Sequence, residues 1–284
     1  MSRILVLGAH GMLGRDLTEV LRSSSQGEVI PWDLGEIDIR EEKGTVKKIG
    51  ELRPDLIINA AALTRVDDCE FQTEQAFAVN AEGMRHVALA ALRCQAKVVY
   101  LSTDYIFDGK KREPYLEGDP PHPLNAYGRS KWKGEEYVRA LLEHWLIVRT
   151  QWLYGKHGKN FVTSILGQAR ERDELRIVND QVGSPTYSAD LSKILATLIQ
   201  KGTEGVFHVT NSGTCSWYEF GRAILQLSGL DRIRVTPISS EELKKPAIRP
   251  PYSVLGCQKL TATMGTTPRP WIEALGDYLE LLKQ

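Results

Sequence analysis

The chain carries Ile4-Leu5-Val6-Leu7-Gly8-Ala9-His10-Gly11-Met12-Leu13-Gly14 close to its first residue. The apolar residues that open this stretch predict a short buried strand. Leu17, Val20 and Leu21 follow at helical spacing, so we expect a helix to begin where the stretch ends. A strand that runs through a glycine-rich turn into a helix is the opening unit of a parallel sheet covered by helices.

Gly8, Gly11 and Gly14 recur at regular spacing between the expected strand and the expected helix. Glycine lets a chain turn sharply, lets backbone approach a diphosphate, and lets a helix pack closely on a strand. The N-terminus of the helix also offers free N–H groups to an anion. We therefore expect a dinucleotide-binding turn, and an ordinary tight turn is the alternative.

Short apolar runs alternate with longer amphipathic segments up to about residue 150. The longer segments have helical spacing, and Arg53-Pro54 ends one of them before the next apolar run. This alternation predicts an α/β fold, a doubly wound parallel sheet of the Rossmann type, over residues 1–150. The expected strands are Ile4 to Leu7, Val29 to Trp32, Leu56 to Ile58, Val98 to Leu101 and Leu146 to Val148.

The pattern loosens in residues 151–284, where proline and glycine are frequent. We expect this part to form a smaller C-terminal substrate-binding lobe, with some segments returning to the first domain. Helices are expected at Phe161 to Arg170, Leu191 to Gln200, Tyr218 to Leu227 and Trp271 to Leu282, and strands near Leu175 to Val178 and Val206 to Val209.

The 36 basic and 36 acidic residues balance, and neither sign forms a long run. This balance argues against nucleic acid or an anionic membrane as a partner. The apolar stretch near the N-terminus is too short for a secretory or membrane-spanning segment, so we expect a cytoplasmic protein. The widely spaced cysteines match no zinc pattern and are expected to be buried or unreactive thiols: Cys69, Cys94, Cys215 and Cys257.

Asp33 ends the second expected strand, about twenty residues after the glycine turn. A carboxylate in this place can accept hydrogen bonds from a ribose diol, and it repels a ribose 2'-phosphate. Asp33 therefore favours NADH as the cofactor. Arg15 and Arg40 could offset that repulsion for NADPH, so both cofactors stay open. A solvated aspartate at a strand end is the alternative.

Tyr127 and Lys131 lie four residues apart in a segment with helical spacing, so both side chains can face one site. A nearby ammonium and a nicotinamide cation favour the phenolate and lower the pKa of a tyrosine, which can then exchange a proton with a carbonyl oxygen. Thr103 follows the strand Val98 to Leu101, and its hydroxyl can donate a hydrogen bond to the same oxygen. A surface helix and a structural hydroxyl are the alternatives.

Longer motifs extend these features along nearly the whole chain. With them the sequence resembles the extended short-chain dehydrogenase/reductase family and, more narrowly, its dTDP-4-dehydrorhamnose reductase family. The motifs are the glycines at 8 to 14, Asn59-Ala60-Ala61-Ala62, Ser102-Thr103-Asp104-Tyr105-Ile106-Phe107-Asp108-Gly109, Tyr127-x-x-x-Lys131, Arg149-Thr150-Gln151-Trp152, Asn179-Asp180-Gln181-Val182-Gly183-Ser184-Pro185-Thr186 and Arg249-Pro250.

The resemblance implies roles for individual residues. The cofactor's diphosphate, adenosine and nicotinamide half would meet Gly8, Gly11, Met12, Leu13, Gly14, Asp33, Asp38, Ile39, Ala62, Leu63, Thr64, Tyr127 and Lys131. The sugar nucleotide would meet Thr103, Asp104, Phe107, Trp152 and Arg249. Packing in the core is the alternative for Trp152, and a solvated side chain is the alternative for Arg249.

The resemblance also implies a reaction, the NADPH- or NADH-dependent reduction of the 4-keto group of dTDP-4-dehydro-L-rhamnose. Tyr127 would donate the proton, Thr103 would polarise the oxygen, and Lys131 would tune Tyr127 and hold the nicotinamide ribose. Such a reaction is a step in the biosynthesis of sugar nucleotides, which are precursors of polysaccharides. Other readings are a non-catalytic NADP-binding regulatory subunit, similar to the methionine adenosyltransferase beta subunit, and a sugar-nucleotide epimerase or dehydratase on the same fold.

Some relatives hold a magnesium ion between acidic side chains at a dimer contact, one of them directly after the third glycine. Here Gly14 is followed by Arg15 and then Asp16. The metal therefore does not carry over to this sequence, and we expect no metal ligand. A monomer and a homodimer are both expected possibilities.

Overall fold

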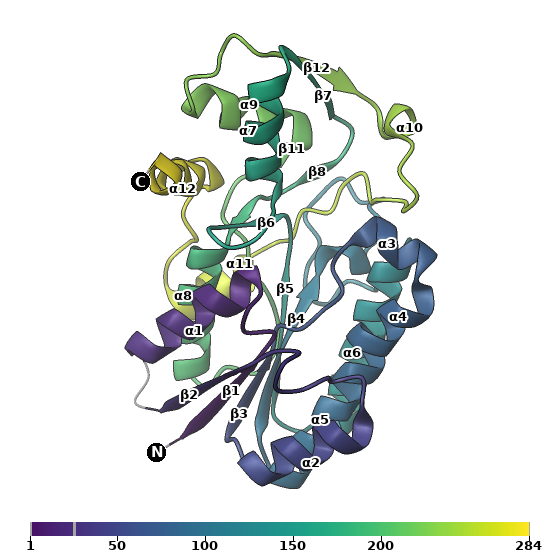
Figure 1. Cartoon of the computed structure of the whole chain (residues 1–284), viewed down its shortest axis with the longest axis vertical. Helices are drawn as coiled ribbons and strands as arrows, with labels where there is room; N and C mark the ends of the chain where they lie inside the picture. Colours follow the sequence, from purple (N-terminus) through teal and green to yellow (C-terminus); the bar gives the residue numbers. More distant parts are fainter. Residues whose placement is uncertain (1, 25–26, 284) are drawn as a thin grey trace.

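A six-stranded sheet forms the centre of the computed structural model, which describes residues 2–24 and 27–283 (Figure 1). Its strands are all parallel, in the order β10-β5-β4-β3-β1-β2. The doubly wound α/β sheet predicted from the sequence is therefore confirmed. The strands are β1 (Arg3–Leu7), β2 (Glu28–Trp32), β3 (Leu56–Asn59), β4 (Lys97–Thr103), β5 (Trp145–Thr150) and β10 (Gly205–His208).

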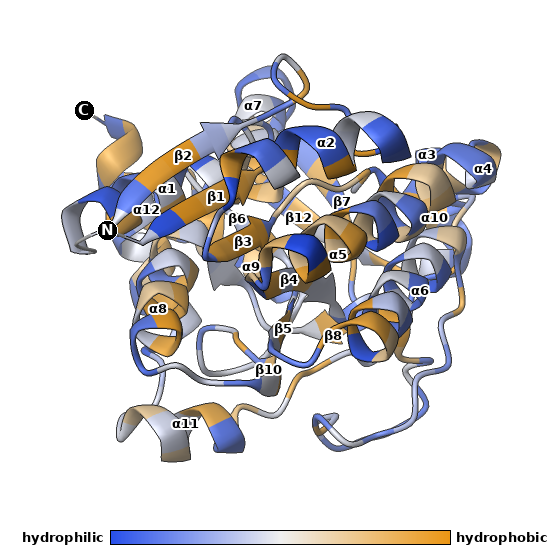
Figure 2. Cartoon of the chain, turned by 90° about the horizontal axis from the view of Figure 1, so that it is seen from below, coloured by the Kyte–Doolittle hydropathy of each residue, from blue (hydrophilic) through white to orange (hydrophobic). Residues whose placement is uncertain are grey.

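Helices cover both faces of the sheet, which explains why its strands are almost continuously apolar. In β1, Ile4 and Val6 face one core while Leu5 and Leu7 face the other. Viewed from below, the strands lie between α8 on one side and α5 with α6 on the other (Figure 2). One layer contains α1 (Met12–Ser24) and α8 (Ser188–Gln200), and the other contains α2 (Glu42–Leu52), α5 (Gly83–Cys94) and α6 (Ala126–Leu141).

Strand register brings the carboxyl ends of the central strands to one edge of the sheet. Leu7 pairs with Asn59, and Thr103 pairs with Thr150. The glycine turn follows β1, short elements follow β3, and the turn η2 (Asp104–Ile106) follows β4 at this edge. The short elements are α3 (Val66–Phe71), α4 (Thr73–Phe77) and η1 (Ala78–Glu82).

Above this edge lies a further part of the molecule with its own core, which we call the upper layer; it is at the top of Figure 1. Tyr154, Tyr187, Phe220 and Tyr278 pack together in that core. Its elements are β6 (Leu153–Tyr154), α7 (Phe161–Glu171), β7 (Glu174–Val178), β8 (Val182–Gly183), β9 (Thr186–Tyr187), β11 (Cys215–Ser216), α9 (Trp217–Leu227), β12 (Arg234–Ile238), α10 (Ser240–Leu243) and α12 (Trp271–Lys283).

Residues after 150 contribute both to the main sheet with its covering helices and to the upper layer. β10 pairs with β5 in the main sheet, and α8 packs against α1. The helix α11 (Gln258–Met264) packs on β10. The division into domains at residue 150 stays a prediction. None of the described helices has the length and apolar character needed to cross a membrane.

Candidate active site

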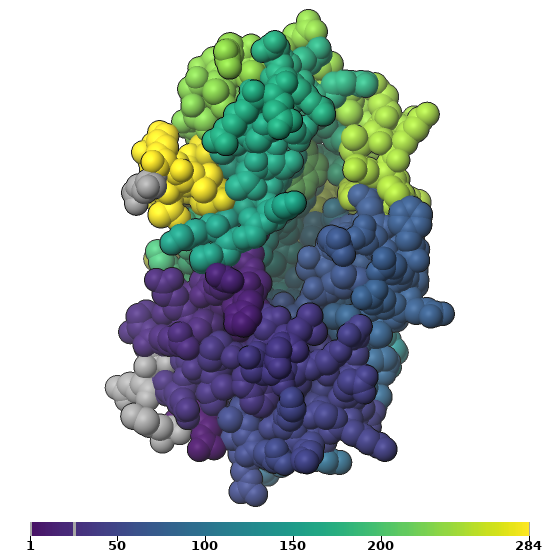
Figure 3. All heavy atoms as spheres, viewed as in Figure 1, coloured from purple at the N-terminus to yellow at the C-terminus, as the bar shows by residue number. Residues whose placement is uncertain are grey.

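The edge of the sheet opens into two adjoining cavities of about 460 and about 450 Å³. The first cavity extends along the end of β2, and the second lies between the end of β4 and the upper layer. Gly8, Gly11, Ala60 and Ala62 line both cavities, so the two form one cleft. Figure 3 shows the molecule hollowed on this face, between the upper layer and the N-terminal half.

The glycine turn leaves no space for side chains at two of its three glycines. Gly8 has φ +73°, and a Cβ added to it would lie 2.6 Å from the Ala61 nitrogen. A Cβ on Gly14 would lie 2.1 Å from the Gly8 oxygen. Helix α1 begins at Met12, so its first N–H groups have no partner within the helix and face the cleft. This geometry fits the diphosphate of a dinucleotide.

Asp33, Asp38 and Ile39 line the first cavity together with Arg40. The carboxylate of Asp33 accepts hydrogen bonds from the backbone N–H groups of His10 and Leu34, at 2.8 and 2.9 Å. Its position is therefore fixed at the end of β2. The Arg40 guanidinium is hydrogen-bonded to Asp38 and lowers the pKa of that carboxyl. Arg40 is thus already paired with an anion.

Arg15, the other arginine considered for NADPH, lies apart from both cavities. Its Nε donates to the His10 carbonyl oxygen at 3.1 Å, and its side chain lines a separate surface groove behind the glycine turn. The structure therefore places Arg15 away from the side of Asp33 that faces the first cavity.

The loop after β3 places Ala62, Leu63 and Thr64 beside the cleft. Asn80, which no sequence motif indicated, holds this loop. Its side-chain amide accepts from the Leu63 nitrogen at 2.8 Å and donates to the Leu63 oxygen at 3.0 Å. The same amide donates to Ser130 Oγ at 2.9 Å, so the loop is tied to α6.

Thr103, Tyr127 and Lys131 line the second cavity together. Thr103 ends β4, and the other two side chains lie one turn apart at the start of α6. Asn125 caps this helix by accepting from the Gly128 nitrogen at 2.8 Å. The structure therefore brings the three predicted catalytic residues to one place.

Burial is the main cause of the pKa shifts of the side chains in this cavity. It raises the pKa of Tyr127 above its ordinary value, although a hydrogen bond with Thr103 acts in the opposite direction. The spacing of Tyr127 and Lys131 predicted a lowered pKa for Tyr127, and that prediction is wrong for this state. Lys131 Nζ lies 4.1 Å from the centre of the Tyr100 ring, and burial lowers the pKa of Lys131 to about 7. In this state Tyr127 is a protonated phenol and can donate its proton.

Asp104 is the only acidic side chain among the described residues that line the second cavity. It is 2% exposed, and burial raises the pKa of its carboxyl to about 7. One oxygen accepts from Thr103 Oγ1 at 3.1 Å, while Oδ2 has no hydrogen-bond partner in the described chain. Two further buried atoms beside this cavity, Thr150 Oγ1 and Gln151 Nε2, also lack a partner there. Together these atoms can bind hydroxyl groups of a sugar.

Aromatic rings close the second cavity from the upper layer. The Trp152 ring stacks on Trp217 with 3.6 Å between ring centres, and both side chains line the cavity. Trp152 has φ +48°, a strained backbone conformation for a bulky residue, which is often found at functional sites. Lys159 also lines this side.

No sequence motif indicated Trp217 or Lys159 as part of the site. The capping box of Ser216 and Glu219 predicts where α9 begins, but not which way the Trp217 ring points.

Phe107 and Arg249 lie outside the lining of either cavity. Phe107 is fully buried, and its ring stacks on Tyr115 with 4.2 Å between centres. Arg249 donates to both oxygens of Asp67, at 2.9 and 3.0 Å. Their roles toward the sugar nucleotide stay predictions, and the structure does not bring them together with Thr103.

Asp16 follows the glycine turn but is engaged within the chain. Ser188 Oγ donates to its carboxylate, and His157 Nε2 lies 3.6 Å from Asp16 Oδ1. Among residues 2–24 and 27–283, no group of three or more histidine, cysteine or acidic side chains is arranged to hold a metal ion.

This chain is similar to known proteins along its whole length. The family model described as RmlD substrate binding domain matches residues 1–284. The spore coat polysaccharide biosynthesis protein SpsK of Bacillus subtilis is 41% identical, with coverage of 99% of this chain and 98% of its own. A crystal structure of dTDP-4-dehydrorhamnose reductase from Clostridium acetobutylicum is 42% identical, with a TM-score of 0.96 over 99% of this chain and 100% of that chain. The dTDP-4-dehydrorhamnose reductase of Bacillus anthracis, solved in complex with NADP, is 39% identical, with a TM-score of 0.94 and full coverage of both chains (100% each).

Proposed function

The chain belongs to the family of the RmlD substrate binding domain, and on that basis we propose that it reduces dTDP-4-dehydro-L-rhamnose to dTDP-L-rhamnose with NADPH or NADH. The observation that carries this proposal is the single cleft that joins the glycine turn to Thr103, Tyr127 and Lys131. A relative with 39% identity is named a dTDP-4-dehydrorhamnose reductase and binds NADP.

Tyr127 donates a proton to the oxygen of the sugar ketone as the 4-keto carbon is reduced. The reduced nicotinamide, when bound, supplies the hydride for that carbon. Carbon and oxygen together gain one hydride and one proton, so the ketone becomes an alcohol. The raised pKa keeps Tyr127 protonated until the developing alkoxide accepts its proton.

Thr103 donates a hydrogen bond to the same ketone oxygen. In this structure the Thr103 hydroxyl donates to Asp104 Oδ1, so it must rotate toward the cavity to reach the ketone. Protonation of Asp104 favours this rotation, because a neutral carboxyl is a weaker acceptor than a carboxylate. The Asp104 pKa of about 7 makes the neutral form available at physiological pH.

Lys131 binds the hydroxyl groups of the nicotinamide ribose and sets the electrostatic field at Tyr127. Asp33 binds the adenosine ribose at the other end of the cleft, and Met12 and Leu13 bind the diphosphate through backbone N–H groups. Trp152, Asp104, Thr150 and Gln151 surround the sugar. The enzyme acts in the cytoplasm, as a monomer or a homodimer.

Dehydration of the sugar is a competing reaction that needs both an acid and a base. Tyr105 stands directly after Asp104, and its ring lies edge-on to Tyr127 with 5.8 Å between centres. Among the described residues that line the second cavity, Asp104 is the only carboxyl, so it would have to serve as both the acid and the base. This composition favours the reductase.

An assay with purified protein tests the proposal. NADPH or NADH is mixed with several 4-keto sugar nucleotides, and the absorbance of the reduced cofactor is followed. Rapid oxidation with dTDP-4-dehydro-L-rhamnose supports the proposal. No turnover with any of these ketones, together with tight binding of NADP and co-purification with a synthetase, would instead favour the regulatory subunit.

A further inference from the structure

Glu135 lies one helical turn after Lys131 and two turns after Tyr127 in α6. The three side chains therefore form one stripe along the helix. Tyr127 and Lys131 line the second cavity, whereas Glu135 lies deeper, with no exposed surface. A carboxylate is seldom buried so completely unless several donors surround it.

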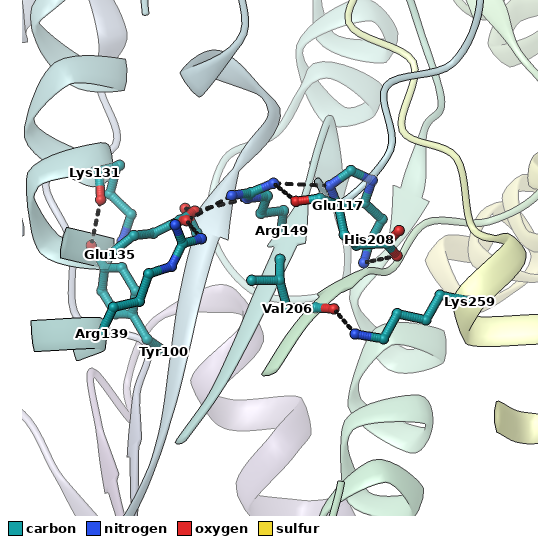
Figure 4. Close-up of polar contacts among 10 residues, drawn as sticks. Tyr100, Glu117, Lys131, Glu135, Arg139, Arg149, Val206, His208 and Lys259 are labelled. Carbon is teal, nitrogen blue, oxygen red and sulfur yellow. Dashed lines mark hydrogen bonds and ion pairs between the residues drawn. The ribbon is translucent and has the colours of Figure 1, made fainter. Parts of the chain in front are cut away.

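The carboxylate of Glu135 is hydrogen-bonded at both oxygens (Figure 4). Oε1 accepts from Ser102 Oγ at 2.6 Å and from Arg149 Nε at 2.9 Å. Oε2 accepts from the terminal nitrogens of Arg149 and Arg139, each at 2.8 Å. Both oxygens of this buried carboxylate are therefore satisfied by hydrogen bonds.

Two of these donors belong to the central strands. Ser102 directly precedes Thr103 in β4, and Arg149 pairs in register with Ser102 from β5. Glu135 therefore joins α6 to the two strands whose ends form the second cavity. Such a clamp fixes the distance between Tyr127 on the helix and Thr103 on the strand.

On its far side, Arg149 contacts no second buried anion in the part of the chain that the structure describes. Arg149 Nη1 donates to the Glu117 carbonyl oxygen at 3.2 Å and lies 3.3 Å from His208 Nε2. Burial and the charge of Arg149 lower the pKa of His208 to about 3, so this ring is neutral. Glu135 is thus the carboxylate that balances Arg149.

We propose that Glu135 is a positioning residue for the reduction, acting through Ser102 and Arg149 and through its charge on Lys131. It holds α6 against β4 and β5 and favours the ammonium form of Lys131. This inference rests on the proposed function, because it assigns a role within the same reaction.

The surroundings of Lys131 explain why the charge of Glu135 matters. Burial lowers the pKa of Lys131, and the negative charge of Glu135 opposes that decrease. Among the described residues, the other titratable or charged groups around this part of α6 include Tyr100 from β4, Arg149 from β5, Asp104 and Tyr105 from η2, Cys69 and Glu70 from α3, and Tyr127 and Arg139 from α6 itself.

A Glu135→Gln variant tests the electrostatic part without changing the size of the side chain. Side-chain NMR of labelled lysine follows the titration of Lys131 in cofactor-free protein, with the signal assigned from a Lys131→Met variant. We expect the Lys131 pKa to fall by about one unit when the nearby charge is removed. Glu136→Gln is the matched control, because Glu136 is half exposed and pairs with Lys133 at 3.3 Å on the same helix. The control should leave the titration unchanged.

Turnover as a function of pH gives a second readout. The protonated fraction of Lys131 decreases as pH rises through its pKa, so a lower pKa removes the ammonium at lower pH. The ratio of the wild-type kcat to the Glu135→Gln kcat should therefore be close to one near pH 5.5 and rise to about ten near pH 8. A ratio that stays constant with pH, with an unchanged Lys131 titration, would overturn the proposal.

Removal of the Glu135 charge leaves Arg149 buried without its partner, and the single variant can unfold for that reason. The double variant Glu135→Gln with Arg149→Met removes both charges and keeps the volume. If Glu135 only neutralises Arg149, the double variant recovers the wild-type Lys131 titration and kcat profile. If the proposal holds, the double variant is folded and still shows the lowered Lys131 pKa.

The wild-type protein separates this inference from the proposed function. If wild type turns over no keto-sugar nucleotide, the reductase assignment fails whatever the lysine titration shows. If wild type is active and the Lys131 titration is the same in wild type, Glu135→Gln and the double variant, only the role of Glu135 fails.

Discussion

Gly128 lies directly against the backbone of Tyr105, so that a Cβ added to Gly128 would be 2.1 Å from the Tyr105 carbonyl oxygen. This contact seats the first turn of α6 on the η2 turn after β4. Tyr127 directly precedes Gly128, and Thr103 lies two residues before Tyr105. The contact between Gly128 and Tyr105 therefore brings Tyr127 and Thr103 to the same cavity. The distance between Tyr127 and Thr103 therefore depends on the absence of a side chain at Gly128.

Gly128→Ala should separate α6 from η2 and reduce both stability and turnover. A methyl group forced against backbone costs about 1–3 kcal/mol of unfolding free energy. Urea unfolding and kcat measure the two effects. Gly50→Ala in α2 is the control, because nothing lies within 4 Å of its added Cβ. Replacement of this helical glycine should raise the unfolding free energy by about 0.5–1 kcal/mol, and equal effects of the two variants would contradict the packing argument.

Tyr127→Phe should lower kcat by about 10²–10⁴-fold, because it removes the proton donor and keeps the ring. Cofactor affinity, measured by calorimetry, should stay close to wild type. Unchanged turnover would exclude Tyr127 as the acid.

Asp104→Asn should stabilise the protein in a pH-dependent way. The folded-state pKa of about 7 lies above the ordinary value of 3.8. At low pH the carboxyl is neutral in both states; as pH rises to about 7, the unfolded chain loses this proton first, so wild-type stability falls. Asparagine has no such loss.

The gain in unfolding free energy from Asp104→Asn should therefore be near zero at about pH 4 and reach about 4 kcal/mol above pH 7. Denaturant unfolding across this range measures it. A gain that does not change with pH would mean that Asp104 titrates normally.

Asp33→Asn should shift cofactor preference toward NADPH. The amide oxygen can still accept from the His10 nitrogen, so the glycine turn stays in place while the charge is lost. We expect the ratio of kcat/KM for NADPH to that for NADH to rise about tenfold. An unchanged ratio would show that Asp33 does not face the 2'-position.

Much of this site could be predicted because its residues follow strands of a parallel sheet. The apolar runs located β1, β3, β4 and β5, and residues at their carboxyl ends must meet at one edge. Helical spacing placed Tyr127 and Lys131 on the same face. Local patterns were sufficient for these features.

Contacts between distant segments were not predictable in the same way. Asn80 holds the loop beside the cleft and Trp217 lines the cleft itself, but the sequence patterns around them define only helices. The pairing of Arg249 with Asp67 joins residues far apart in the chain, and no local pattern indicates it. The raised pKa of Tyr127 depends on the burial of the folded cavity, which a motif does not contain.

The most direct test of the central claim traces the hydride. Wild-type protein is given dTDP-4-dehydro-L-rhamnose and reduced nicotinamide cofactor that carries deuterium at the transferable position. The account predicts stoichiometric oxidation of the cofactor and deuterium on the 4-carbon of dTDP-L-rhamnose, with both strongly reduced in Tyr127→Phe. A dehydrated or epimerised sugar nucleotide, formed without net oxidation of the cofactor, would contradict it.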